Sequence, residues 1–129
     1  MSTIKTDNLQ NVSGTASVPV NTVVNGSAKA WVNFNGTGTV AIRASFNVSS
    51  ISDLGSGNYT VNFTSAMADA NYVVLPHCPS YAGNDINRYL MVHGTNGVPT
   101  LQSASQVRLV HGYSNQVSDV NTGYVAIFR

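Results

Sequence analysis

The side chains that could bind a soft metal ion are three histidines and a single cysteine, namely His77, Cys78, His93 and His111. Zinc sites need Cys and His side chains that converge, usually in closely spaced pairs. His77 and Cys78 are adjacent, so on a strand they would point to opposite faces. We therefore expect isolated polar or half-buried residues and no metal site. The alternative left open is one histidine per chain converging on an ion at a threefold axis.

Groups for acid–base or nucleophilic catalysis are sparse. The acids are five aspartates, and no two of them are paired in the sequence. A glycosidase needs two carboxyl groups across a cleft, whereas Asp53 and Asp85 lie in expected turns, where Asp is favoured for its backbone hydrogen bonds alone. The chain has no Gly-x-Ser-x-Gly nucleophile motif and no glycine-rich phosphate loop that opens a helix. We therefore expect neither enzymatic activity nor a cofactor.

Two expected loops combine tyrosine with amide and carboxylate side chains. Sugars are bound by aromatic faces together with Asn and Asp hydrogen bonds, on loops that a rigid β scaffold holds in place. The alternative is that Tyr81 and Tyr113 only cap the edge of the core, with one end buried and one end in water. The residues that we predict for receptor binding are Tyr81, Asn84, Asp85, Tyr113, Asn115 and Gln116.

The scaffold for these loops is clearest between Ala28 and Thr64. Apolar and polar residues alternate there in three runs, which are separated by Gly36-Thr37-Gly38 and Gly55-Ser56-Gly57. This period of two, with glycine-centred breaks, predicts an antiparallel meander with one buried face. In the second run, alternate residues from Val40 to Val48 are expected to share one face. The large side chains expected in the core are Trp31, Phe46, Tyr59, Phe63 and Phe128.

Further strands are predicted at near-regular spacing in segments 71–78, 88–93, 106–113 and 123–129. The last segment is apolar on both faces, so we expect it either at the centre of the fold or covered by a neighbouring subunit. About seven to nine short strands with turn residues between them are typical of a sandwich or barrel. The prediction is an all-β fold, with an antiparallel β-sandwich or jelly-roll-like domain over residues 28–129.

Composition excludes several classes of protein. Charged residues make up 9% of the chain, against about 25% in typical soluble proteins. The net charge of +1 provides no basic field for phosphate groups, so we expect no nucleic-acid binding. No apolar run reaches the length of a membrane span, and the N-terminus lacks a signal-peptide pattern, so we expect no membrane insertion. The lone Cys78 cannot form an internal disulfide, which fits assembly in a reducing cytoplasm.

The stretch from Ser2 to Val74 resembles a module of bacteriophage tail fibres and related virion structural proteins. Its most specific pieces are Trp-Val-Asn-Phe at 31–34 and Asn-Tyr-Thr-Val-Asn-Phe-Thr at 58–64. The resemblance implies a homotrimer that is made in the host cytoplasm and sits on the tail or capsid surface of the virion. It carries no catalytic residues, because the module is structural.

We therefore predict a small tail-fibre or receptor-binding component that attaches to a host surface glycan or protein. One alternative is a capsid decoration or fibre protein that stabilises the shell, and another, from a different class, is a polysaccharide depolymerase. Residues 1–27 are polar and β-branched without helical periodicity, so we expect an extended N-terminal arm with one or two short strands around Val18–Val24. That arm is either a partly ordered terminus or a segment that attaches to other virion proteins or to its own neighbours.

Overall fold

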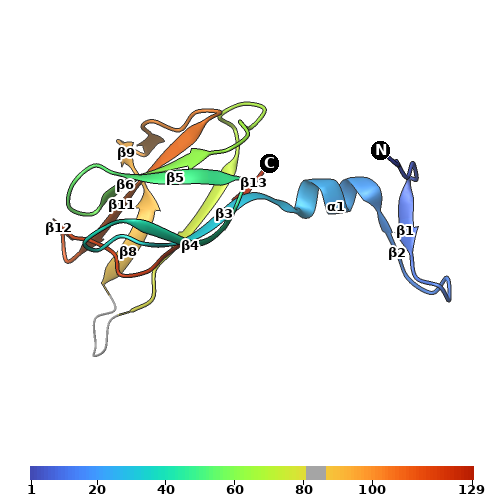
Figure 1. Ribbon diagram of the computed structural model, residues 1–129, viewed down its shortest axis with the longest axis horizontal. Helices are drawn as coiled ribbons and strands as arrows, with labels where there is room; N and C mark the ends of the chain where they lie inside the picture. The colour runs from blue at the N-terminus through green and yellow to red at the C-terminus, as the bar shows by residue number, and fades with distance from the viewer. Residues whose placement is uncertain (81–86) are drawn as a thin grey trace.

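Two antiparallel sheets account for most of the computed structural model, which describes residues 1–80 and 87–129 (Figure 1). The strands of the first sheet are β3 (Ala28–Asn35), β4 (Ala41–Phe46), β7 (Val73–His77) and β13 (Gly123–Phe128). Those of the second are β5 (Val48–Asp53), β6 (Asn58–Phe63), β8 (Arg88–Val92), β11 (Gln106–Tyr113) and β12 (Gln116–Val117). The first sheet runs in the order β4-β3-β13-β7. In the second, β11 lies between β6 and β8, β5 borders β6, and β12 pairs with the end of β11.

One hydrophobic core joins the two sheets, and the prediction of an all-β fold is confirmed. Phe34 of β3 and Tyr59 of β6 are both fully buried, and their rings meet edge to face with centroids 5.3 Å apart. On β11 the inward face is formed by Val107, Leu109 and His111, which are all buried. The four later strands also fall within the predicted segments. The short hairpin of β9 (Gly94–Thr95) and β10 (Val98–Pro99) lies outside both sheets.

The meander expected between Ala28 and Thr64 is in fact two hairpins, one in each sheet. Strands β3 and β4 pair in the first sheet, and β5 and β6 pair in the second. The chain changes sheet at Asn47, whose φ of 53° lies in the left-handed region. The Asn47 side chain fixes this corner, since it donates to the carbonyl oxygens of Lys29 and Ser65 at 3.1 Å each. The alternation from Val40 to Val48 therefore does not define one face.

The expected core is correct for Tyr59 and Phe63 but wrong for two of the other aromatic residues. Trp31 is 40% exposed and Phe46 is 55% exposed. Both lie on the outer face of the first sheet, where they are cross-strand partners. The strand alternation explains this outcome, because Ala30, Val32 and Phe34 occupy the inner face of β3. Phe128, which is half-buried, also points away from the inner face that Val125 and Ile127 of β13 fill.

The sequence left open whether the last strand lies at the centre of the fold or is covered by a neighbouring subunit. Strand β13 lies inside the first sheet, between β3 and β7. Its inward residues Val125 and Ile127 are 3% and 0% exposed. Its outward residues face away from the core, and Tyr124 remains 41% exposed. A central position therefore accounts for only one of its two apolar faces.

Residues 1–27, here called the N-terminal segment, extend away from the two sheets (Figure 1). The segment consists of a hairpin of β1 (Asn8–Gln10) and β2 (Ser17–Pro19), followed by helix α1 (Val20–Gly26). The helix was not predicted, because its valines were interpreted as strand residues. Val18 and Val20 are half-buried, and every other residue of the segment is exposed.

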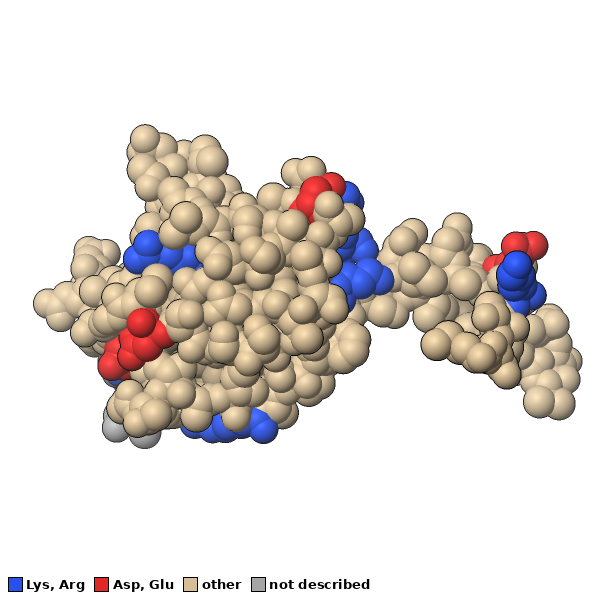
Figure 2. Space-filling view, turned by 45° about the horizontal axis from the view of Figure 1, so that its top comes forward, with Lys and Arg blue, Asp and Glu red and all other residues tan. Residues whose placement is uncertain are grey.

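Charge is sparse on the surface. Figure 2 shows a few isolated spots of Lys, Arg and Asp on an otherwise uncharged face. Arg129 and Asp69 form an ion pair. Within the described residues, no helix combines the length and the apolar character that crossing a membrane requires.

Candidate ligand-binding cleft

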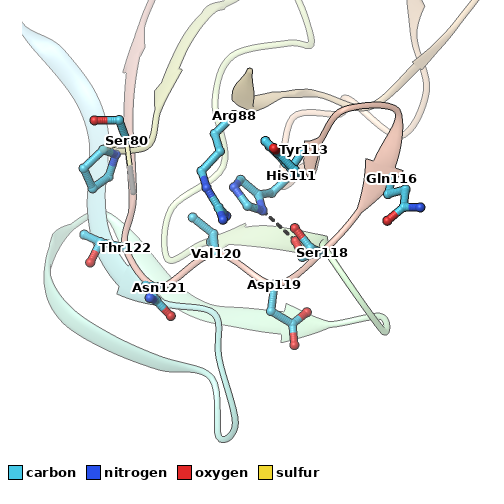
Figure 3. A pocket seen from close by; sticks show the side chains of 11 residues that line it. Ser80, Arg88, His111, Tyr113, Gln116, Ser118, Asp119, Val120, Asn121 and Thr122 are labelled. Atoms are coloured by element: carbon cyan, nitrogen blue, oxygen red, sulfur yellow. Dashed lines mark hydrogen bonds between the residues drawn. The ribbon is translucent and has the colours of Figure 1, made fainter. Parts of the chain in front are cut away.

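A cleft of about 510 Å³ opens where the second sheet meets the loop that leads into β13 (Figure 3). Four segments that are far apart in the sequence supply its walls: the residues after β7, the start of β8, the end of β11 with β12, and the loop 118–122. Most of its lining side chains are polar, and they include Arg88, His111, Tyr113, Gln116, Asp119 and Thr122.

The loop that forms one wall is clamped to the second sheet through Gly57. The Gly57 N–H donates to Asp119 Oδ1 at 2.8 Å, and the Gly57 carbonyl accepts from the His111 N–H at 2.7 Å. Gly57 has a φ of +67°, and a Cβ on it would lie 2.4 Å from the His111 carbonyl oxygen. Only glycine fits against the backbones of His111 and Ser118. The close approach lets the Gly57 N–H hold the Asp119 carboxylate at the rim of the cleft.

Tyr59 supports the same loop from the core side. Its hydroxyl donates to the Gly36 carbonyl at 3.0 Å, accepts from the Val120 N–H at 3.1 Å, and lies 3.3 Å from Asp119 Oδ1. Burial raises the pKa of this hydroxyl to about 12, and the neighbouring Asp119 carboxylate adds to the shift. Tyr59 therefore stays neutral and keeps its proton for these contacts.

Arg43 of β4 holds the far end of the loop. Its guanidinium donates to the Asn121 carbonyl at 2.9 Å, to Thr122 Oγ1 at 3.1 Å and to the Phe34 carbonyl at 3.0 Å. The loop is thus tied to the second sheet at Asp119 and to the first sheet at Thr122. A wall held from both sides is pre-organised, which lowers the entropy cost of binding a ligand.

His111 forms the buried back of the cleft and is 1% exposed. Its Nδ1 lies 2.6 Å from the Ser118 carbonyl oxygen, which can only accept, so Nδ1 carries the proton (Figure 3). Burial lowers the pKa of the imidazole, and the positive charge of Arg88 lowers it further. The ring is therefore neutral at pH 7 and acts as a structural donor in the cleft.

Arg88 and Tyr113 form the opposite wall. The guanidinium carbon of Arg88 lies 5.3 Å from the centroid of the Tyr113 ring, which is a cation–π distance. Figure 3 shows the Arg88 side chain extending into the cleft toward His111. With Asp119 on the other wall, the cleft carries one positive and one negative side chain among its described residues.

The structure brings two of the predicted receptor-binding residues together. Tyr113 and Gln116 both line the cleft, at the end of β11 and on β12. Asn115 lies between them in the turn and borders a separate hollow beside Asn87 and Tyr89. Three further predicted residues lie outside the described part of the chain: Tyr81, Asn84 and Asp85.

Several cleft residues were missed by the sequence-based selection. His111 was considered as a possible metal ligand and not as a binding residue, and no residue between Gln116 and the last strand was selected. The run Ser118-Asp119-Val120-Asn121-Thr122 directly before the last strand was the available signal, since polar loop residues at strand ends commonly form sites. Arg88 had no such signal, because nothing in its sequence context places it opposite Asp119.

The possible metal ligands do not come together. His77 is exposed and stacks on Tyr124 with ring centroids 6.3 Å apart, whereas Cys78 is buried, as expected for neighbours on a strand. Burial raises the pKa of the Cys78 thiol. His93 instead contacts Thr100, with 2.5 Å between Nδ1 and Oγ1. In residues 1–80 and 87–129, no three His, Cys, Asp or Glu side chains are close enough to hold a metal ion.

No protein-family model, curated protein or solved structure matches this chain. The function must therefore be argued from the cleft itself. Its carboxylate, amides, hydroxyls and aromatic ring are groups that bind the hydroxyl groups and apolar faces of sugars. Its opposite charges balance, which favours a neutral ligand over a strongly anionic one.

Proposed function

We propose that this chain is a structural protein of a bacteriophage virion, a small tail-fibre or receptor-binding component that attaches to a neutral glycan on the host surface. The resemblance over Ser2 to Val74 supports this class of protein. The polar cleft supports an attachment site in it. In this proposal the two packed sheets form a β-sandwich, the N-terminal segment is the attachment arm, and three copies assemble.

The observation that carries the proposal is the position of the cleft relative to the N-terminal segment. Strands β3 and β13 are antiparallel neighbours, with Ala28 opposite Phe128 and Phe34 opposite Gly123. The N-terminal segment enters at Ala28, whereas the cleft loop enters at Gly123. A strand of six residues spans about 20 Å, so the two features lie at opposite ends of the first sheet. This arrangement suits a protein held by one end that presents a binding site at the other.

The cleft also supports binding over hydrolysis. Among its described lining residues, Asp119 is the one acidic side chain; its Oδ1 already accepts from the Gly57 N–H and lies 3.3 Å from the Tyr59 hydroxyl. Glycoside hydrolysis commonly requires two carboxyl groups on either side of the scissile bond. Three copies that each bind weakly would gain avidity on a surface covered with the same glycan.

The test uses purified labelled protein and cells of the bacterium on which the virus grows. Tyr113→Ala and Gln116→Ala should each weaken cell binding by about tenfold or more, because they remove a stacking face and a hydrogen-bonding amide from the cleft. Asn115→Gly is the matched control, because it removes the amide outside the cleft while glycine keeps the left-handed backbone of the turn (φ 66°), and it should bind normally. Neutral oligosaccharides released from the host envelope should compete.

Equal binding by all three variants would remove the cleft from the proposal. Immunogold labelling of virions tests the remaining part: label on the tail supports a fibre component. Label spread over the shell would favour the capsid decoration protein instead.

A further inference from the structure

The outer face of the first sheet carries a continuous row of apolar side chains. Cross-strand pairing places Phe46 opposite Trp31, Trp31 opposite Ala126, and Ala126 opposite Leu75, so the row crosses all four strands. Side chains paired in this way lie side by side on one face. Two further residues flank the row, Val73 on β7 and Tyr124 on β13. We call the row and these two residues the outer apolar face.

The outer apolar face has the size and composition that often mark an interaction site. Its five large side chains are 40–59% exposed, which amounts to roughly 500 Å² at the usual area of such side chains. Contiguous apolar patches beyond a few hundred Å² usually mark an interaction site. Leu75 and Val73 have no π face for stacking on a sugar, so the composition favours a protein partner.

The same chain contains a second apolar element without a partner. Helix α1 carries Val20, Val23 and Val24 at spacings of three and four, which places them on one side of the helix. None of its residues is buried, and Val23 and Val24 are 40% and 54% exposed. The helix has seven residues, no side-chain N-cap bond and three β-branched valines. Isolated helices shorter than about 12 residues are marginal in water, so α1 needs a packing partner.

The N-terminal segment is held away from its own sheet. Ser27 and Lys29, at the junction with β3, donate side-chain hydrogen bonds to the Val23 and Val24 carbonyls at the end of α1. These contacts cap the helix and set its direction relative to β3. Figure 1 shows the segment pointing outward from the sheets. The partner of α1 is therefore not the outer apolar face of the same copy.

We propose that the N-terminal segment of one copy docks on the outer apolar face of a neighbouring copy, with the valine side of α1 against the row from Phe46 to Leu75. The lengths agree, because seven helical residues span about 10 Å and three strand spacings span about 14 Å. The contact is heterologous, since it joins two different surfaces; such contacts close into a ring when the rotation between neighbours closes and otherwise build an open filament. The proposal here is the closed ring. This inference needs only the chain itself and holds whether or not the protein binds a glycan.

The buried area favours this arrangement over one in which the outer apolar faces of two copies pack on each other. A stable interface buries about 800 Å² per partner, and the outer apolar face alone falls short of that. In the proposed ring, every copy buries its outer apolar face and the apolar side chains of its N-terminal segment, while the polar side of the segment is left for attachment. The apolar side chains of the segment, which include Leu9 at 48% and Ile4 at 87% exposure, supply the missing area.

Disulfide trapping tests which surfaces meet. Two single variants, Val24→Cys and Ala126→Cys, are co-expressed as full chains with tags of different size and treated with a mild oxidant. We expect cross-linked pairs that contain one of each, at least about tenfold above the pairs formed between Val24→Cys and Leu54→Cys, an exposed position in the turn after β5. The native Cys78 is buried and stays in every variant, so the parent protein gives the background.

Each other outcome overturns the proposal. Pairs of Ala126→Cys with itself would mean that the outer faces pack together, and pairs of Val24→Cys with itself would mean that the helices do. A bond within one chain of the Val24→Cys/Ala126→Cys double variant would mean that the segment folds back. Failure to cross-link would mean that α1 and the outer face do not meet.

Solution mass gives an independent readout. Light scattering of the parent protein should give a closed oligomer, and Val24→Asp should weaken association by about tenfold or more, because it places a charge on the docking side of α1. Thr22→Asp adds the same charge on the opposite side of the helix and should leave the mass unchanged. Equal masses for the two variants, or a monomeric parent, would contradict the inference.

Discussion

The hydroxyl of Tyr59 offers a sharp test of how the cleft is held together. Tyr59→Phe keeps the ring against Phe34 and removes one buried oxygen. The Gly36 carbonyl then loses its donor, and the Val120 N–H loses its acceptor. A buried polar group left without a partner costs about 1–3 kcal/mol. We therefore expect the free energy of unfolding at pH 8 to fall by about 2–3 kcal/mol.

The difference between the two proteins should shrink at alkaline pH. Burial raises the pKa of Tyr59 from 10.0 to about 12. The unfolded chain releases this proton above pH 10 while the folded protein keeps it, so the parent protein loses stability as pH rises from 10 to about 12. The slope approaches 1.4 kcal/mol per pH unit, and Tyr59→Phe lacks this loss. The cost of the substitution should therefore fall by roughly 1 kcal/mol between pH 9 and pH 11.

Urea unfolding at 25 °C, followed by far-UV circular dichroism, measures both effects. Tyr72 has a pKa that is also raised to about 12 by burial, but it is present in both proteins and cancels in the difference. Tyr124→Phe is the control at pH 8, where loss of an exposed hydroxyl should change stability by less than about 0.5 kcal/mol. A pH-independent cost of Tyr59→Phe would refute the assignment of a buried, neutral hydroxyl under the cleft.

Three further predictions concern the core and the cleft. Phe63→Ala should cost about 3–5 kcal/mol in urea unfolding, because Phe63 is 8% exposed and meets Tyr72 edge to face; a cost below 1 kcal/mol would contradict this packing. Gly57→Ala should lower the melting temperature sharply, since its Cβ would collide with the His111 carbonyl, and an unchanged melting temperature would rule out the close approach. Because burial lowers the pKa of His111, its stabilising contribution is present above pH 6.5 and is lost as pH falls, so the melting temperature should decline from pH 7 to pH 5.

Periodicity predicted the strands well because a period of two is a local property of the chain. The segment around β6 alternates strictly, and Tyr59 and Phe63 are buried on its inward face as expected. Periodicity could not predict that β4 and β5 belong to different sheets. That outcome depends on one residue, Asn47, whose left-handed backbone and two side-chain hydrogen bonds turn the chain. A change of chain direction at one residue leaves the alternation of apolar and polar residues in the flanking strands unchanged, so the alternation does not reveal it.

The cleft was predictable only in the part that is local in sequence. Tyr113 and Gln116 are three residues apart, and both were selected for their type and loop position. Arg88 reaches the cleft because β8 pairs with β11, with Arg88 opposite Tyr113. Asp119 is fixed by Gly57, 62 positions away. Contacts of this kind follow from strand order, which the alternation of residues does not encode.

The exposure of Trp31 and Phe46, which were expected in the core, bears directly on the proposed assembly. The sequence-based prediction placed both residues in the core. The inner face of β3 is already filled by smaller residues and Phe34, so Trp31 has no place there. Placing Trp, Phe and Leu side by side across four strands would be a liability for a free monomer. The same residues stabilise the protein if a neighbouring copy covers them. The apolar outer face of the first sheet is therefore the physical cause of both the error in the expected core and the proposed assembly.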